Sequence, residues 1–102
     1  MKPPLKYSLY SILYHAGEKG IWEYEIYSLL KSAYNQRALV KVREILIELK
    51  TKAWTDEVET ILYNDELVRK YKLQSRHNSF IEYMLPNTVE LLAEVGVDAK
   101  AL

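Results

Sequence analysis

An apolar stripe between residues 39 and 49 constrains the fold of this chain more than any other feature of its sequence. The apolar side chains recur at the spacing of one helix face and lie within roughly 120° of one another on a helical wheel. They are Leu39, Val42, Ile45, Leu46 and Leu49. Asn35 precedes the stripe and is suited to cap a helix, because its side chain can accept a hydrogen bond from a free backbone amide. The pattern predicts a helix over residues 36–52 with one face in a core.

Three further helices are predicted from periodicity and from residues that start or stop helices. Residues 5–16 follow two prolines and end before Gly17. Residues 23–32 carry an apolar stripe of their own. Residues 88–95 begin with a capping-box-like pattern and end before Gly96.

From Val58 onward the apolar pattern becomes that of strands. Residues 58–63, 67–74 and 80–85 are rich in β-branched and aromatic side chains, and polar turn-like groups separate them. We therefore expect a three-stranded antiparallel meander over residues 58–85.

The segment 56–66 leaves a second interpretation open. Its apolar residues would also suit a short helix capped by Thr55 or Asp56. The sequence alone does not decide between strand and helix here.

Composition limits the class of protein. The 102 residues suit one domain spanning the whole chain, and 49% of them are hydrophobic, which is typical of an ordered globular protein. The absence of cysteine excludes disulfides and thiol chemistry and fits a cytoplasmic location. No segment has the length and apolar character of a signal peptide or membrane span. We expect an α+β domain without membrane contact.

Residues that carry catalysis or bind metals are sparse. His15 and His77 are the only histidines, and neither has a partner at metal-ligand or triad spacing. Gly17, Gly20 and Gly96 stand singly, so there is no glycine-rich phosphate loop. We expect no enzyme, no cofactor, no metal site and no small-molecule ligand.

The charges are unevenly placed although their sum is zero, with 14 Lys+Arg and 14 Asp+Glu. Between Leu67 and Ser79 there is a basic cluster without any acid. It consists of Arg69, Lys70, Lys72, Arg76 and His77. The acids collect at 18–25, 56–66 and 82–98, where we interpret them as solvated. A neutral chain can still present one basic face, although these cations could also be ordinary solvated side chains of a β-ribbon.

Ile21-Trp22 can form a short edge strand between the first two helices. The order helix, short strand, helix, helix, β-ribbon, helix resembles the winged-helix form of the helix-turn-helix. In that family the recognition helix carries an apolar stripe like the one above, then a small residue and an apolar residue, here Ala53 and Trp54. Many relatives have Gly where Ala53 stands. The run from Tyr83 to Thr88 is similar to the family's strand before the last helix, and Tyr24-Glu25-Ile26 resembles a motif of PadR-like repressors.

The resemblance implies a three-helix core, a two- or three-stranded β-wing and a short C-terminal helix. The interval between Trp54 and Phe80 is long for a wing, which predicts an inserted strand or helix there.

In winged-helix proteins the recognition helix enters the major groove of DNA while the wing contacts phosphates. The resemblance therefore implies phosphate contacts by the basic cluster and groove contacts by the exposed start of the helix. These helix residues are Asn35, Gln36, Arg37, Lys41 and Glu44. A carboxylate at Glu44 is repelled by phosphate unless it accepts from a cytosine amino group or braces a neighbouring cation. We expect a small transcriptional regulator that binds double-stranded DNA.

The alternative is a winged-helix module that binds another protein and does not read DNA. Val40 and Ile47 are apolar on the outward helix face, where they would touch thymine methyls, pack under the ribbon or meet a second subunit. Tyr7, Tyr10 and Tyr14 form a stripe on the first helix. Two-fold dimers are common in the family, so we expect this stripe to be a homodimer interface, unless it packs on the last helix and the tail.

Overall fold

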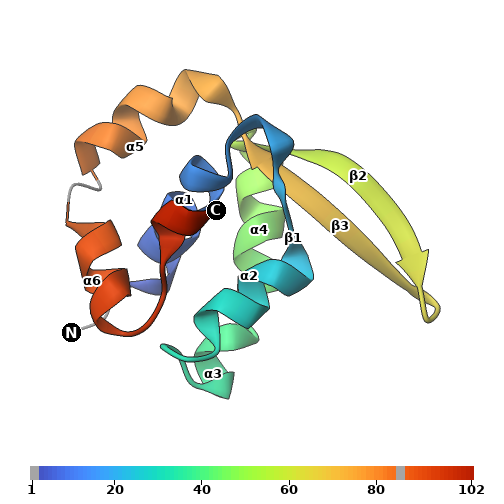
Figure 1. Ribbon diagram of the computed structural model, residues 1–102. Helices are drawn as coiled ribbons and strands as arrows, with labels where there is room; N and C mark the ends of the chain where they lie inside the picture. The colour runs from blue at the N-terminus through green and yellow to red at the C-terminus, as the bar shows by residue number, and fades with distance from the viewer. Residues whose placement is uncertain (1–2, 85–86) are drawn as a thin grey trace.

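Helices and a three-stranded antiparallel sheet make up the fold in the computed structural model, which describes residues 3–84 and 87–102 (Figure 1). In chain order the elements are α1 (Leu5–Ala16), η1 (Gly17–Lys19), β1 (Ile21–Trp22), α2 (Glu23–Leu30), α3 (Gln36–Leu39), α4 (Val42–Thr51), β2 (Thr55–Tyr63), β3 (Glu66–Leu73), η2 (Ser75–His77), α5 (Asn78–Met84), α6 (Thr88–Glu94) and η3 (Ala99–Ala101). Within these ranges, no helix combines the length and apolar character needed to cross a membrane.

The core lies between α1, α2, α4 and the base of the sheet. The predicted stripe is confirmed, because four of its members are buried and Ile45 packs partly buried against them. Side chains with almost no exposed surface include Leu9, Ile12, Leu13, Ile26, Leu30, Val42, Leu46, Leu49 and Tyr71. Burying one such apolar side chain contributes about 1.5–3 kcal/mol. The apolar periodicity of the sequence therefore supplies the core of the domain.

The helix predicted over residues 36–52 is present as two pieces, α3 and α4. Val40 and Lys41 separate them and keep right-handed helical backbone angles. The Lys41 amide donates to the carbonyl of Ala38, three residues back, so the interruption is one tight turn of 3₁₀ type. Asn35 caps α3 as predicted, since its Oδ1 accepts from the Ala38 amide at 2.9 Å.

The end of α4 adopts a left-handed turn without a glycine. Ala53 has a φ of 60°. The Trp54 amide donates to the Leu49 carbonyl at 2.9 Å and the Ala53 amide to the Lys50 carbonyl at 3.0 Å, which together form a Schellman motif. The Cβ of an alanine makes this conformation unfavourable by roughly 1–2 kcal/mol. Arg76 donates to the Ala53 carbonyl at 2.9 Å and helps to hold the turn.

The sheet has the strand order β1-β3-β2, so β3 is its central strand. The short strand β1 pairs with β3 only at Ile21 opposite Tyr71 and Trp22 opposite Lys70. In contrast, β2 pairs with β3 along its whole length. Beyond β1 the hairpin therefore continues as two strands that project from the body (Figure 1).

The hairpin has one irregularity and a tight tip. A register shift between Glu57 and Glu59 leaves Val58 as an extra residue in β2, as in a β-bulge. At the tip, Asn64 and Asp65 have φ values of 50° and 63°, the angles of a two-residue type I′ turn. The segment 56–66 is thus strand and turn, and the short helix left open by the sequence does not form.

The prediction of a third meander strand over residues 80–85 is wrong. Residues 78–84 form the helix α5, and Leu85 lies outside the described residues. Ile81 is buried against the core while Phe80 and Tyr83 are exposed, so packing on the body overrides the strand propensity of these aromatic residues. The interval after Trp54 is long because β2 and β3 have nine and eight residues and because η2 and the start of α5 follow them, so the inserted element is helical.

Replacing Ala53 with glycine is expected to raise the free energy of unfolding by about 0.5–1 kcal/mol, because glycine adopts a positive φ without a Cβ clash. Ala38→Gly is the matched control and is expected to lower it by a similar amount, since Ala38 lies in α3. Urea unfolding followed by tryptophan fluorescence measures both. Equal losses in the two variants would contradict the left-handed conformation at Ala53.

Candidate nucleic-acid interface

The helix start that was predicted to contact DNA is open to solvent. Its residues Asn35, Gln36, Arg37, Lys41 and Glu44 are all exposed. Within the described residues, neither Arg37, Lys41 nor Glu44 makes an ion pair. Arg37 lies in α3, and Lys41 lies in the tight turn that separates α3 from α4. Two unpaired cations and one unpaired acid therefore share this surface.

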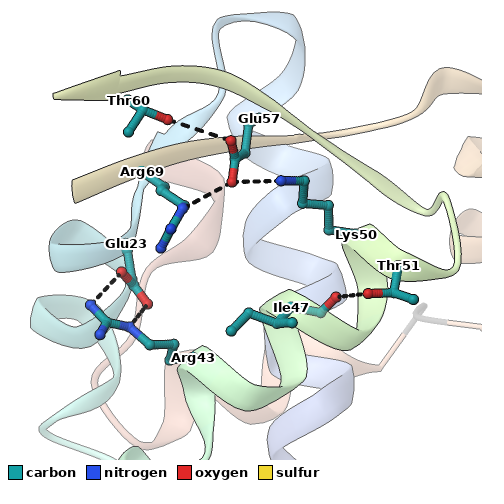
Figure 2. A network of polar contacts seen from close by, with 8 residues as sticks. All are labelled: Glu23, Arg43, Ile47, Lys50, Thr51, Glu57, Thr60 and Arg69. Atoms are coloured by element: carbon teal, nitrogen blue, oxygen red, sulfur yellow. Dashed lines mark hydrogen bonds and ion pairs between the residues drawn. The ribbon is translucent and has the colours of Figure 1, made fainter. Parts of the chain in front are cut away.

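An ion pair between a buried carboxylate and a half-exposed arginine joins α2 to α4. Glu23 is only 3% exposed. Its Oε1 accepts from Arg43 Nε at 3.0 Å and its Oε2 from Arg43 Nη2 at 3.2 Å (Figure 2). This two-pronged contact raises the pKa of Arg43, mainly through the hydrogen bonds and charge of Glu23. Arg43 thus braces the two helices and is not free to contact a phosphate.

The interpretation of Glu23 as a solvated acid is wrong. Its partner is 20 residues away in the sequence, and no local pattern connects the two positions. An acid at the first position of a helix is common for electrostatic reasons alone, so its placement carried no sign of burial.

A second network ties the hairpin to α4. Glu57 Oε1 lies 2.8 Å from Lys50 Nζ and 3.0 Å from Arg69 Nε (Figure 2). The hydroxyl of Thr60 donates to the other carboxylate oxygen at 3.4 Å. The bond from Lys50, with the charge of Arg69, lowers the pKa of Glu57 although partial burial acts against it. Lys50 and Arg69 are therefore both engaged by one carboxylate.

The basic cluster predicted for the wing does not gather at one place. Arg69 is paired with Glu57, and Lys72 Nζ lies 3.0 Å from Glu18 Oε2. Lys70 Nζ stands 5.6 Å from the centre of the Trp22 ring, in reach of a cation–π contact. Of these three side chains in β3, only Lys70 is without an ion pair in the described part of the chain.

Arg76 and His77 lie in η2, at the base of the hairpin and outside its strands, so their expected place in the wing is corrected. Arg76 donates to the carbonyl of Ala53, as described above. The His77 ring stacks on Trp54 with centroids 4.0 Å apart and an angle of 11°. Both residues therefore contact the turn that ends α4.

The tyrosine stripe on α1 is covered mainly by the chain itself. Tyr10 is buried, and its ring stacks on Trp54 at 5.5 Å and on Tyr7 at 6.4 Å. The Tyr14 hydroxyl donates to Glu82 of α5 at 2.5 Å, which raises the pKa of Tyr14. The stripe packs against α5 and Trp54. Tyr10 is therefore not accessible to a second copy, contrary to the homodimer interface that we expected from the sequence.

Two apolar side chains are exposed on α4 and the turn before it, and one of them lines a cleft between α4 and the hairpin. Val40 and Ile47 are 61% and 49% exposed, so the ribbon does not cover them. Ile47 lines the cleft together with Lys50, Thr51, Glu57, Arg69 and Tyr71. This surface is mixed in character, because its cations are already paired and its apolar groups are open.

Searches of protein-family models, curated proteins and solved structures found no match to this chain. In the part of the chain that the structure describes, no three His, Asp or Glu side chains are placed to hold a metal ion. The function is therefore argued from the exposed start of α3 and the surfaces beside it.

Arg43→Ala is expected to lower the free energy of unfolding by about 2–3 kcal/mol, because it leaves the buried carboxylate of Glu23 without a partner. Arg37→Ala removes an exposed arginine and is expected to change stability by less than about 0.5 kcal/mol. Urea titrations measure both. The double variant Glu23→Gln, Arg43→Met should recover part of the lost free energy of unfolding. A loss in the double variant equal to the summed losses of Glu23→Gln and Arg43→Met would contradict the pair.

The contribution of Glu57 to stability is expected to fall in acid. Its folded pKa is lowered below 4.5, so its stabilising effect is present above that pH and is lost as pH falls through the folded value. The difference in urea midpoint between the natural chain and Glu57→Gln should therefore shrink between pH 6 and about pH 3. Glu59→Gln removes one charge at a position with no ion pair in the described residues and controls for charge alone.

Proposed function

We propose that this chain is a winged-helix protein that binds double-stranded DNA through the start of α3 and α4. The observation that carries the proposal is that Arg37 and Lys41 are exposed and make no ion pair within the described residues. They stand at the beginning of a helix that follows α2 after a short turn and precedes a two-stranded hairpin. In a winged helix this helix start meets the major groove.

The residues of the helix start divide into two roles. Arg37 and Lys41 supply charge for phosphates, which gives affinity without sequence preference. Gln36 carries an amide that can bond a base edge, most favourably adenine. Asn35 uses its carbonyl oxygen to cap α3, so only its amino group remains to donate to DNA. Glu44 limits the bases tolerated beside it, because a carboxylate accepts from cytosine and is repelled by phosphate.

Few phosphate contacts are available to this protein. The internal ion pairs of Arg43, Lys50, Arg69 and Lys72 leave Lys70 as the cation of the wing that supports DNA contact. Each neutralised phosphate contributes about 0.9 to the logarithmic salt slope, so three contacts give a slope near 3. Such a protein binds DNA modestly at physiological salt and acts as a regulator by occupying its site.

Arg37→Ala with Lys41→Ala is expected to weaken binding to a random-sequence duplex and to reduce the salt slope by about two units. Fluorescence anisotropy at several salt concentrations measures both quantities. Lys19→Ala with Lys31→Ala removes the same charge from exposed positions in η1 and after α2, and serves as the matched control. An unchanged slope in the first variant, or an equal loss in the control, would sink the DNA proposal.

The exposed apolar pair Val40 and Ile47 favours a second candidate, a module that binds another protein through the same face. The two candidates separate in one comparison. Ile47→Ser leaves every charge in place, so DNA affinity at low salt should change little if phosphates supply the binding energy. A protein-binding module would show no duplex affinity to lose.

A further inference from the structure

The outer edge of β2 is open, because β2 pairs only with β3 among the described residues (Figure 1). Natural edge strands are usually protected by charges, bulges or short length, which prevent another strand from pairing there. Here the protection covers only the base half of β2. Asp56, Glu57 and Glu59 and the bulge at Val58 lie in that half. The run Thr60–Tyr63 beyond them has neither charge nor bulge.

The unprotected half also carries apolar side chains that the chain does not cover. Ile61, Leu62 and Tyr63 are 40%, 68% and 65% exposed. They lie where the hairpin continues past β1, which ends its pairing at Lys70 and Tyr71. A two-stranded hairpin without further cover is marginally stable in water, and additional strands stabilise it. This segment is therefore suited to gain a third strand.

We propose that β2 pairs antiparallel with β2 of a second copy of this chain, around a two-fold axis at Ile61. The two hairpins then form one continuous four-stranded sheet. The register of the known hairpin decides which side chains meet on each face, because directly opposed residues point to the same side.

An axis at Ile61 aligns the apolar residues of both copies. Ile61 stands opposite Val68 within one hairpin and opposite its own counterpart across the axis. One row of the sheet then reads Val68, Ile61, Ile61, Val68. Two residues along the strand, on the same face, Glu59 of one copy lies opposite Tyr63 of the other. Its neighbour on the other side is Lys70 of its own hairpin. Cross-strand pairs of this kind contribute about 0.2–1 kcal/mol each.

Neighbouring registers are less favourable. An axis at Glu59 opposes two identical carboxylates, and an axis at Leu62 sets Glu59 against Asp65 of the second copy. An axis at Thr60 separates the two Ile61 side chains. An axis at Ile61 also sets Glu57 against Asp65 of the second copy, but Glu57 lies beyond the bulge at Val58, where the ladder is interrupted. Like charges directly opposite one another destabilise a sheet, so the charge pattern within residues 59–63 favours Ile61 as the centre.

A second copy fits this edge better than it fits the edge of β3. On that side β1 occupies the positions beside Lys70 and Tyr71, so an added strand would meet β1 after Arg69. The pairing on β2 involves few residues, and we expect a small interface of roughly 1,000–1,200 Å² in total, the size of weak complexes. Dimerisation should therefore depend on protein concentration.

The proposal stands apart from DNA binding, because it concerns the hairpin and is tested without nucleic acid. Sedimentation velocity from roughly 10 to 300 µM should show a rising share of dimer, as expected for an interface of this size. Ile61→Lys should abolish it and leave the circular dichroism spectrum unchanged. Val40→Lys places the same charge on an exposed apolar position of the helix face and should leave dimerisation intact. A chain that stays monomeric throughout, or loses its dimer only with Val40→Lys, overturns the proposal.

The absence of cysteine allows the axis itself to be located. In an antiparallel pair, opposed residues have Cα atoms about 4.5–5.5 Å apart, within the range that a disulfide spans. Ile61→Cys should therefore form a disulfide-linked dimer rapidly under mild oxidation. Tyr63→Cys lies four positions from its counterpart along the strand and should form it at least tenfold more slowly. Equal rates, or faster linkage at Tyr63, would contradict an axis at Ile61.

Discussion

The contact between Glu23 and Arg43 is the constraint on which the candidate surface depends. A carboxylate that is almost fully buried requires a partner, and Arg43 satisfies both of its oxygens. This pair joins the first turn of α2 to the first turn of α4. The segment between α2 and α4, which contains α3, exposes Arg37 and Lys41.

Most cations of α4 and the hairpin are engaged in ion pairs within the described residues. Glu57 pairs with both Lys50 and Arg69, and Glu18 pairs with Lys72. Cations that are close in sequence therefore form ion pairs at different places. What remains for a polyanion is a small patch at the helix start with Lys70 of the hairpin. The distal hairpin is apolar and acidic in contrast, which suits contact with protein better than contact with phosphate.

The helices were predictable where one face is apolar over several turns, as in α1 and α4, because periodicity alone identifies a helix that packs against a core. The helix that includes residues 80–84 was not predictable, since short aromatic runs suit both strand and helix. Only the burial of Ile81 decides between them. The exposed start of α3 was predictable from its cap. The neutralisation of Arg69 and Lys72 was not, because their partners lie on other elements.

The sequence by itself determined the α+β class, the apolar stripe of α4 and the Asn35 cap, all of which follow from local spacing and residue type. Tertiary structure decided which charges are available. Glu23 and Arg43 are 20 residues apart, and Lys72 and Glu18 are 54 apart. Electrostatic pairing depends on distance in space, and only the fold brings such residues within reach of one another.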